Sequence, residues 1–281
     1  MTLSIITINY NNENGLAKTL RSVGNQSCRD FEYIVIDGNS TDRSRKLIEN
    51  SSDLVNRWIS EPDSGVYNAM NKGIRMSSGD YLLFLNSGDI LADDRVIARI
   101  LPMLDADSDI ISGNLIYSLN GIPKTLFTPP EKIDLTHFLH SFLPHPSSFI
   151  KRDLFGTVGS YNEYLKIISD WEFFLKAIVI HKAKYRHINI TVSDFDNSGI
   201  SSNDGNKALM EKEKESVYRK YFPNLENEMN VLQFASSRRM LQIKNIYTDY
   251  PFLWKLLKLC INFLNIFVSK KETESFTKIK N

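Results

Sequence analysis

Cysteine is scarce in this chain, which has only Cys28 and Cys260 among its 281 residues. The two lie far apart in sequence and do not have the spacing of metal ligands. We therefore expect no disulfide, which suits a reducing compartment. No basic region or cleavage site precedes the first apolar run, so we expect no secretory signal.

Glycine-rich phosphate loops and an excess of one charge are also missing. Neither G-x-G-x-x-G after the first predicted strand nor G-x-x-x-x-G-K-[ST] occurs, which argues against a dinucleotide-type Rossmann site and a P-loop. The 34 Lys and Arg residues balance 33 Asp and Glu residues, so overall charge argues neither for nor against nucleic acid. The 42% hydrophobic content is ordinary for a globular protein.

One stretch, residues 79–89, organises the rest of the chain. Residues 81–85 form a short apolar run between turn residues, which predicts a strand buried on both faces, as in a parallel sheet. The run ends in Asn86-Ser87-Gly88-Asp89, and ligands of open α/β sheets bind outside the carboxyl ends of the strands. A carboxylate there can hold a hard cation with positions left for phosphate oxygens, although a capped turn is the simpler alternative.

Apolar runs alternate with helical periodicity over the first ninety residues. The pattern predicts strands at 3–8, 31–36, 55–59 and 81–85, with a helix after each of the first three. This order predicts an α/β fold with a parallel sheet and right-handed crossovers. For the less regular second half we expect strands at 109–117 and 184–192, a hairpin turn at 120–121, a helix opening at Ser169 or Asp170, a mobile polar loop at 194–206, and helices at 209–221 and 225–246.

Several motifs occur in one order and together carry a family resemblance. They are Ser4-Ile5-Ile6-Thr7-Ile8-Asn9-Tyr10-Asn11, Ile34-Val35-Ile36-Asp37-Gly38-Asn39-Ser40-Thr41-Asp42, Asn71-Lys72-Gly73-Ile74, residues 79–89, His145-Pro146-Ser147-Ser148-Phe149 and Ser169-Asp170-Trp171. With them, residues 1–200 resemble a glycosyltransferase family 2 enzyme. That resemblance implies the GT-A fold, a Rossmann-like, mostly parallel sheet with flanking helices. Within the family, Asp63-Ser64-Gly65-Val66-Tyr67-Asn68 together with Asn86-Ser87-Gly88-Asp89 resembles the sequences of enzymes that build bacterial surface polysaccharide.

The resemblance implies a division of the chain and a set of partners. Residues 1–205 would form the GT-A domain, with a nucleotide-sugar-binding half over 1–105 and an acceptor half over 106–205. Residues 206–281 would form a C-terminal helical region. The implied activity moves a sugar from a nucleotide-sugar donor, expected to be a UDP-sugar, to a hydroxyl of a lipid-linked saccharide acceptor in polysaccharide, O-antigen or capsule biosynthesis, with no nucleic acid involved.

The resemblance also implies roles for single residues. Asp89 matches the acid that binds Mg²⁺ or Mn²⁺ on the donor diphosphate, and Asp170 matches the catalytic base. The residues expected to bind the donor are Thr7, Asn9, Tyr10, Asp37, Lys72, Asn86, Ser87, Gly88 and His145. The chain departs from the family's pattern at Gly38, Asn86 and Gly88, where many relatives carry acids. An amide at Asn86 can still hydrogen-bond a ribose hydroxyl.

The implied reaction needs two kinds of group. The leaving diphosphate gains negative charge, which a divalent ion stabilises. The acceptor hydroxyl must lose a proton, and a positioned carboxylate that takes it is typically worth ~10²–10⁴-fold in rate. Direct attack by the acceptor hydroxyl on the anomeric carbon, assisted by one base, inverts the anomeric configuration. A helix N-cap is the alternative role for Asp170.

Other assignments stay open. His145 either contacts the diphosphate or metal or is structural, and Trp171 either stacks on the acceptor sugar or lies in the core. Lys72 and Arg75 either reach phosphate or belong to a solvated helix face. A nucleotidyltransferase would need a glycine-rich basic loop after the first strand, which residues 9–12 do not offer. The chain could also be a membrane-associated binding module that has lost turnover, but the presence of both Asp89 and Asp170 argues against this alternative.

Residues 251–268 are dense in Phe, Leu, Ile and Trp and read as an amphipathic helix. Its polar residues form one helical stripe: Lys255, Lys258, Asn262 and Asn265. From Arg238 onward nine basic residues and three acids give a charge of +6, which suits an anionic membrane. The stretch is short for spanning, so we expect a cytoplasmic protein that lies peripherally on the inner-membrane surface. A helix docked on the domain or a dimer contact is the alternative.

Overall fold

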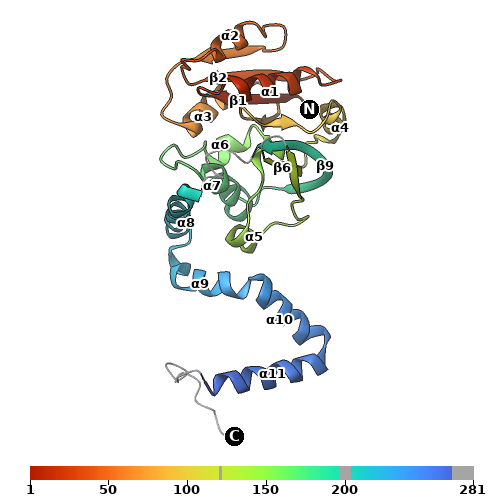
Figure 1. Ribbon diagram of the computed structural model, residues 1–281, viewed down its shortest axis with the longest axis vertical. Coiled ribbons are helices and arrows are strands. Elements are labelled where there is room, and N and C mark those ends of the chain that lie inside the picture. Colours follow the sequence, from red (N-terminus) through yellow and green to blue (C-terminus); the bar gives the residue numbers. More distant parts are fainter. Residues whose placement is uncertain (120–121, 197–203, 268–281) are drawn as a thin grey trace. The chain divides into compact units, whose positions relative to one another are not determined.

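The computed structural model describes residues 1–119, 122–196 and 204–267 (Figure 1). The chain divides into two compact units, Met1–Asn224 and Leu225–Asn281. The expected boundary at residue 205 lies inside the first unit, because helix α8 (Lys207–Tyr221) buries Val217 in the core of that unit.

A mixed sheet forms the centre of the first unit. Its strands are β1 (Leu3–Asn9), β2 (Glu32–Asp37), β3 (Arg57–Ser60), β4 (Tyr81–Phe84), β5 (Ile90–Leu91), β6 (Ile110–Leu119), β7 (Ile122–Phe127), β8 (Ser148–Lys151) and β9 (Tyr185–Asp196). Their order is β3-β2-β1-β4-β8-β6-β9-β5, with β7 paired to β6. Strands β1 to β4 are parallel, and β8 runs antiparallel between β4 and β6. The predicted mostly parallel sheet with flanking helices is confirmed.

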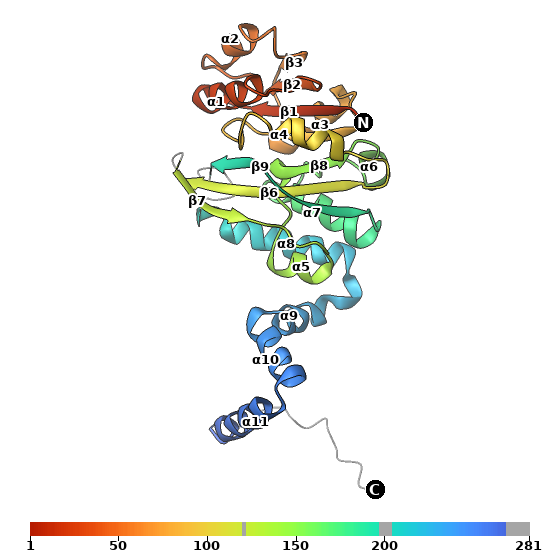
Figure 2. The same cartoon turned by 90° about the vertical axis from the view of Figure 1, so that its right-hand side faces the viewer.

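Helices cover both faces of this sheet (Figure 2). The helices of the first unit are α1 (Glu13–Gly24), α2 (Ser44–Glu49), α3 (Val66–Met76), α4 (Val96–Ile100), α5 (Leu135–His140), α6 (Leu154–Val158), α7 (Ser169–Leu175) and α8, with a π-helical turn at Lys176–Ile180. Alternate residues of β1 point to opposite faces, so Ile5 packs with α1, α2 and α4 while Ile6 packs with α3, α6 and α7. All four residues of β4 are buried, as the apolar run predicts.

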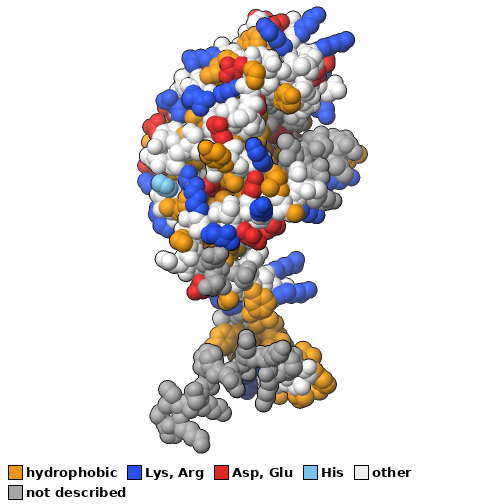
Figure 3. Space-filling model, turned by 90° about the vertical axis from the view of Figure 1, so that its left-hand side faces the viewer, with side chains coloured by type: hydrophobic (Ala, Val, Ile, Leu, Met, Phe, Trp, Pro, Cys, Tyr) orange, Lys and Arg blue, Asp and Glu red, His pale blue; other side chains and the backbone are white. Residues whose placement is uncertain are grey.

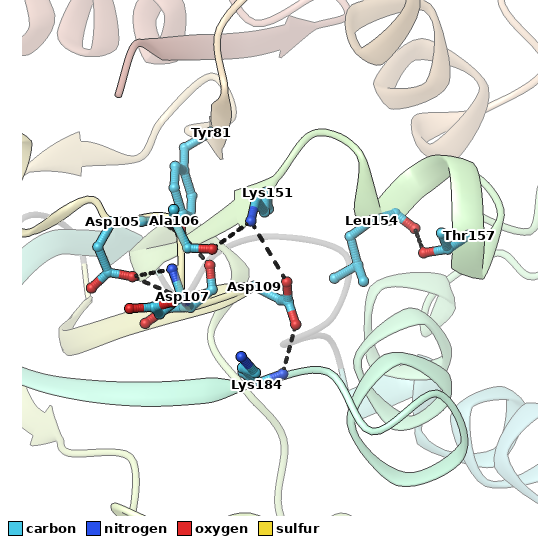
Figure 4. Close-up of polar contacts among 10 residues, drawn as sticks. Tyr81, Asp105, Ala106, Asp107, Asp109, Lys151, Leu154, Thr157 and Lys184 are labelled. Carbon is cyan, nitrogen blue, oxygen red and sulfur yellow. Dashed lines mark hydrogen bonds and ion pairs between the residues drawn. The ribbon is translucent and has the colours of Figure 1, made fainter.

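The amino end of β4 is closed by the loop before β6 (Figure 4). The Tyr81 hydroxyl donates to the Asp105 carbonyl over 2.8 Å, and Lys151 Nζ donates to the Ala106 carbonyl over 2.8 Å. Asp109 accepts a 2.8 Å bond from the backbone N–H of Lys184. These contacts fix one end of the sheet, and the polar turn after β4 lies at the other.

Several element boundaries differ from the sequence prediction. The third strand lies at 57–60 rather than 55–59. Strand β9 continues to residue 196, because its last residues pair in parallel with Ile116, Tyr117 and Ser118 of β6. Residues 194–196 of the predicted loop are therefore strand, and residues 197–203 lie outside the described residues. The predicted turn at 120–121 is also outside them, between the antiparallel strands β6 and β7.

The second unit is helical, but the single helix predicted at 225–246 is wrong. The structure has α9 (Glu226–Ala235), α10 (Arg238–Asp249) and α11 (Pro251–Asn265). The helix breaks at two serines, where the Ser237 hydroxyl caps α10 by accepting from the Met240 N–H. No helix in the described part of the chain is long and apolar enough to cross a membrane.

Candidate active site

A cleft of about 1100 Å³ opens at the carboxyl ends of β1 and β4 and reaches α7 and α8. It is larger than most small-molecule pockets, which leaves room for two substrates. Eight of the sequence-predicted site residues line it: Asn9, Tyr10, Asn86, Ser87, Gly88, Asp89, His145 and Asp170. They come from four segments that are far apart in sequence and that the fold brings together.

Three predicted residues do not line the cleft: Thr7, Asp37 and Lys72. The Thr7 hydroxyl is buried and donates to the Leu85 carbonyl over 2.7 Å. Lys72 Nζ lies 2.9 Å from Glu61 and donates to the Pro62 carbonyl. In this structure these side chains support the fold around the cleft.

Asp37 binds the side chain of Asn9, which lies opposite it on the neighbouring strand. Its Oδ1 accepts from Asn9 Nδ2 (2.9 Å) and the Ser40 hydroxyl, and its Oδ2 accepts from the Ser40 N–H and the Ser60 hydroxyl (2.7 Å). Burial opposes ionisation, but these hydrogen bonds outweigh it and lower the pKa of Asp37. Asn9, whose amide nitrogen is held in this way, is a lining residue of the cleft, and its buried Oδ1 has no hydrogen-bond partner among the described residues.

Asp63 lies beside the glycine that departs from the family's pattern. A Cβ on Gly38 would stand only 2.5 Å from Asp63 Oδ2 and 3.1 Å from the Tyr10 ring. The carboxylate of Asp63, a lining residue of the cleft, thus occupies the space next to Gly38, the position at which the family resemblance leads us to expect an acid. The two residues are 25 positions apart, so sequence spacing did not reveal this pairing.

The turn at residues 86–89 is held by helix α1. The Thr19 hydroxyl accepts from the Gly88 N–H (3.0 Å) and donates to the Asp89 carbonyl (2.8 Å). Asn12 adds a 3.0 Å bond from its amide to the Ser87 carbonyl. Gly88 has φ +112°, a conformation that glycine adopts readily and an acid there would not. A threonine inside an amphipathic helix carries no sequence signal for this role.

A chain of polar contacts joins this turn to the candidate base. Asn86 Nδ2 lies 3.2 Å from His145 Nε2, and His145 Nδ1 lies 3.3 Å from Asp170 Oδ2. The Tyr67 hydroxyl lies 2.9 Å from Asp170 Oδ1. With the Asn86 amide oriented this way, His145 accepts at Nε2 and donates from Nδ1. Asn86 Oδ1 stays buried with no hydrogen-bond partner in the described part of the chain.

Asp170 lies in the first turn of α7. The N-cap position is Ile168 and no side chain caps this helix, so the N-cap alternative for Asp170 is wrong. Burial opposes ionisation of Asp170, but the hydrogen bonds that it accepts from His145 and Tyr67 lower its pKa. Asp170 is therefore a carboxylate at neutral pH, as a proton acceptor must be.

Helix α8 anchors the loop that precedes Asp170. The buried Glu213 carboxylate accepts from the backbone N–H groups of Lys166 (2.6 Å), Ile167 (3.1 Å) and Ile168 (3.3 Å). Trp171 belongs to the core rather than to a stacking surface, because it is 4% exposed. Its indole N–H donates to the Ser141 carbonyl over 3.2 Å.

The described residues of the cleft supply only some of the ligands that a divalent ion needs. The described residues contain no group of three His, Cys, Asp or Glu side chains placed to bind a metal. The 86–89 turn offers the Asp89 carboxylate and the unpartnered Asn86 Oδ1. Such a set fits Mg²⁺ or Mn²⁺ that takes its remaining ligands from substrate phosphates and water.

Sequence comparison relates the chain to one family. The model of "Glycosyl transferase family 2" matches residues 4–156. A PGL/p-HBAD biosynthesis glycosyltransferase of Mycobacterium bovis is 31% identical over 206 residues, which cover 71% of this chain and 78% of the relative. An uncharacterized glycosyltransferase of Mycobacterium tuberculosis is 34% identical over 206 residues, which cover 72% and 77%.

Solved structures share the fold. S. aureus TarS 1–349 in complex with UDP-GlcNAc matches with a TM-score of 0.64 at 17% identity, over 91% of this chain and 76% of that one. The mannosyltransferase PcManGT from Pyrobaculum calidifontis, in complex with GDP-Man and Mn²⁺, matches with a TM-score of 0.59 at 14% identity, over 94% and 80%. At these identities the likeness shows the fold alone.

Proposed function

Because the chain belongs to glycosyltransferase family 2 and has the GT-A fold, we propose that it transfers a sugar from a UDP-sugar to an acceptor hydroxyl with inversion. One observation carries the proposal. Asp89 and Asp170 line the same cleft, and Asn86 and His145 connect them. A transferase of this kind needs a diphosphate site and a base side by side.

The nucleotide would bind at the end of β1. Asn9 lines the cleft and has a buried amide oxygen without a hydrogen-bond partner among the described residues, which suits an N–H of the base. Tyr10 is 65% exposed at the same place and offers an aromatic face for stacking. UDP is the proposed nucleotide because TarS was solved with UDP-GlcNAc.

The diphosphate would bind at the 86–89 turn. Asp89 and Asn86 Oδ1 would hold Mg²⁺ or Mn²⁺, which would stabilise the charge on the leaving diphosphate. The PcManGT complex that shares the fold contains Mn²⁺. Thr19 and Asn12 keep the turn in place, so this part of the site is formed before a substrate binds.

Asp170 would take the proton of the acceptor hydroxyl. The acceptor oxygen forms a bond to the anomeric carbon while the bond to the diphosphate oxygen breaks, and the leaving diphosphate keeps that electron pair. The proton moves to a carboxylate oxygen of Asp170, which His145 and Tyr67 hold in place. A single displacement of this kind inverts the anomeric configuration.

The second unit would place the protein on the inner-membrane surface, next to a lipid-linked acceptor of polysaccharide biosynthesis. Helices α10 and α11 have no buried residues of their own, and hydrophobic side chains gather on the C-terminal helices (Figure 3). On α11 the most exposed large apolar residues are Phe252, Leu259, Phe263 and Leu264. Lys255 and Lys258 add positive charge, as in helices that lie in an anionic interface.

Thermal protection of the purified chain tests this function. UDP and UDP-sugars should raise the melting temperature, and Mn²⁺ should increase the shift, because a ligand that binds only the folded state stabilises it. Asp89→Asn should remove the part that depends on Mn²⁺. Failure of every nucleotide tested to protect the wild-type chain would contradict the proposal.

A further inference from the structure

Helix α7 carries a second carboxylate, which the proposed reaction does not use. Glu172 lies two residues after Asp170, is 2% exposed and is not a lining residue of the cleft. A helix turns by about 100° per residue, so the two side chains leave α7 on nearly opposite sides. Asp170 lines the cleft, and Glu172 lies on the buried side of the same helix.

The Glu172 carboxylate is bonded to the end of α8. The Tyr221 hydroxyl donates to Glu172 Oε1 over 2.8 Å, and Lys220 Nζ lies 3.4 Å from the same oxygen. Tyr221 is the last residue of α8, and 58% of the Lys220 side chain is accessible. An ion pair with so exposed an ammonium group is weak, so the hydrogen bond from Tyr221 is the stronger contact.

The backbone of Glu172 belongs to the turn that holds the candidate base. Its N–H donates to the Ile168 carbonyl over 2.9 Å, and this bond closes the first turn of α7, which contains Asp170. A displacement of the Glu172 side chain therefore moves the turn that carries the base. Because Glu213 of α8 holds the segment just before this turn, α8 contacts it at two places.

The apolar contacts of α7 do not fix its rotation in the same way. Trp171 meets Phe138 and Tyr218 edge-on, with ring centroids 6.1 and 5.4 Å apart. Hydrophobic packing is not directional, whereas a hydrogen bond requires a defined distance and angle. Burial of a carboxylate is costly, and an apolar side chain of similar volume often stabilises a protein equally well. The buried charge of Glu172 therefore adds little to stability, but its hydrogen bond fixes the orientation of α7.

We propose that Glu172 is a positioning residue, which holds α7 through Tyr221 in the rotation that directs the Asp170 carboxylate into the cleft. Neither Glu172 nor Tyr221 lines the cleft, so both act through Asp170. The inference rests on the proposed function, because it takes Asp170 as the base of the transfer. It adds a pair of residues that set the rate through the orientation of that base.

The test measures kcat and the donor KM of the full chain and its variants. The reaction is release of UDP, with Mn²⁺ present, from whichever of UDP-glucose, UDP-galactose and UDP-GlcNAc best protects the wild type from heat. Tyr221→Phe removes only the hydroxyl that holds Glu172. We expect it to lower kcat about tenfold with KM unchanged, which is less than the ~10²-fold effect of a 1 Å misplacement. Glu172→Met, which removes the acceptor of the same bond, should lower kcat in the same way.

Tyr218→Phe is the matched control on the same helix. It removes a hydroxyl that donates to the Phe138 carbonyl over 3.0 Å instead of to α7. Each of the two tyrosine variants loses one hydrogen bond, so both should lower the melting temperature by a similar amount. Tyr218→Phe should nevertheless keep the wild-type kcat, and a role of Tyr221 in stability alone would not produce this difference.

Full kcat in Tyr221→Phe, or an equal loss of kcat in Tyr218→Phe, would overturn the inference. So would a double variant, Glu172→Met with Tyr221→Phe, that loses as much as both single variants combined, because residues that act through one contact are not additive. Hydrogen exchange of the amides of residues 168–172 gives a readout that needs no turnover. Tyr221→Phe should speed this exchange, and unchanged exchange would also overturn the inference. UDP affinity and turnover of the wild type show separately whether the proposed function holds.

Discussion

His145 Nδ1 lies 3.3 Å from Asp170 Oδ2, and its Nε2 lies 3.2 Å from the Asn86 amide nitrogen. One imidazole therefore touches both the turn that carries Asp89 and the candidate base on α7. His145 lies directly before β8, the strand between β4 and β6. This position fixes the ring relative to both groups. We infer that His145 sets the geometry in which donor and acceptor meet.

Replacement of His145 by Ala should slow transfer more than it weakens donor binding. Asp170 would lose the contact that orients it, and misplacement of a catalytic group by about 1 Å costs up to about 10²-fold. Steady-state rates and UDP titration in the same preparation measure the two effects. His181→Ala, at an exposed histidine that does not line the cleft, is the control. An unchanged turnover rate for the His145 variant would remove it from this role.

Tyr67→Phe should move the acidic limb of the pH–rate profile to higher pH. The Tyr67 hydroxyl stabilises ionised Asp170, so it lowers the pKa of that carboxyl, and its removal raises that pKa. Activity falls as pH drops through this pKa, because the base becomes protonated. The profile of kcat/KM against pH measures the shift. Tyr164→Phe, at a fully solvated tyrosine, should leave the profile in place.

Thr19→Val should weaken metal-dependent donor binding. Valine keeps the shape of threonine but leaves the Gly88 N–H and the Asp89 carbonyl without their buried partner. The lost bonds should cost about 1–3 kcal/mol of stability and loosen the turn. UDP affinity with and without Mn²⁺, together with thermal unfolding, measures both. Thr19→Ser retains the hydroxyl and should behave like the wild type; equal affinity in all three proteins would count against the role of Thr19.

Glu213→Gln should lower turnover although Glu213 does not face the reaction. Its carboxylate accepts three backbone N–H groups just before α7, and an amide can satisfy fewer of them. We expect a less ordered Asp170, a lower melting temperature and unchanged UDP affinity. Glu215→Gln, on the exposed face of α8, is the matched control. A variant that loses stability but keeps full turnover would show that Glu213 serves the fold alone.

Deletion of residues 249–281 should abolish membrane binding and leave nucleotide binding intact. The deletion removes α11 and its exposed apolar residues, while the cleft lies wholly within residues 8–214. Sedimentation with liposomes that contain anionic lipid measures the first effect, and UDP titration the second. Liposome binding by the shortened chain, or no binding by the full chain at low salt, would refute the membrane role.

The parts of the fold that follow from sequence are those with local signals. Strands β1, β2 and β4 are buried on both faces, so mostly apolar runs mark them, and the carboxyl ends of β1 and β4 place Asn9, Asn86 and Asp89 at one sheet edge. The ends of β9 depend instead on pairing with β6, which sequence periodicity does not encode. The break between α9 and α10 was missed because serines are also tolerated inside helices.

Sequence motifs pointed to the candidate residues of the 86–89 turn, to His145 and to Asp170. They did not point to the residues that hold these groups through tertiary packing. Nothing in the sequence distinguishes Thr19 or Glu213 from other polar residues of amphipathic helices. Asp37 looks like a free acid at a strand end, but four hydrogen bonds already fill its oxygens. Tertiary contacts decide which polar residues face the cleft and which support it.

The most direct test of the account is transfer by Asp170→Asn. Asparagine keeps the shape of the side chain but cannot accept the acceptor proton. The measurement is release of UDP from the UDP-sugar that best protects the wild type, with Mn²⁺ present and UDP affinity determined alongside. The account predicts a loss of ~10²–10⁴-fold in rate with UDP affinity unchanged. Near-normal turnover by a folded Asp170→Asn protein would contradict it.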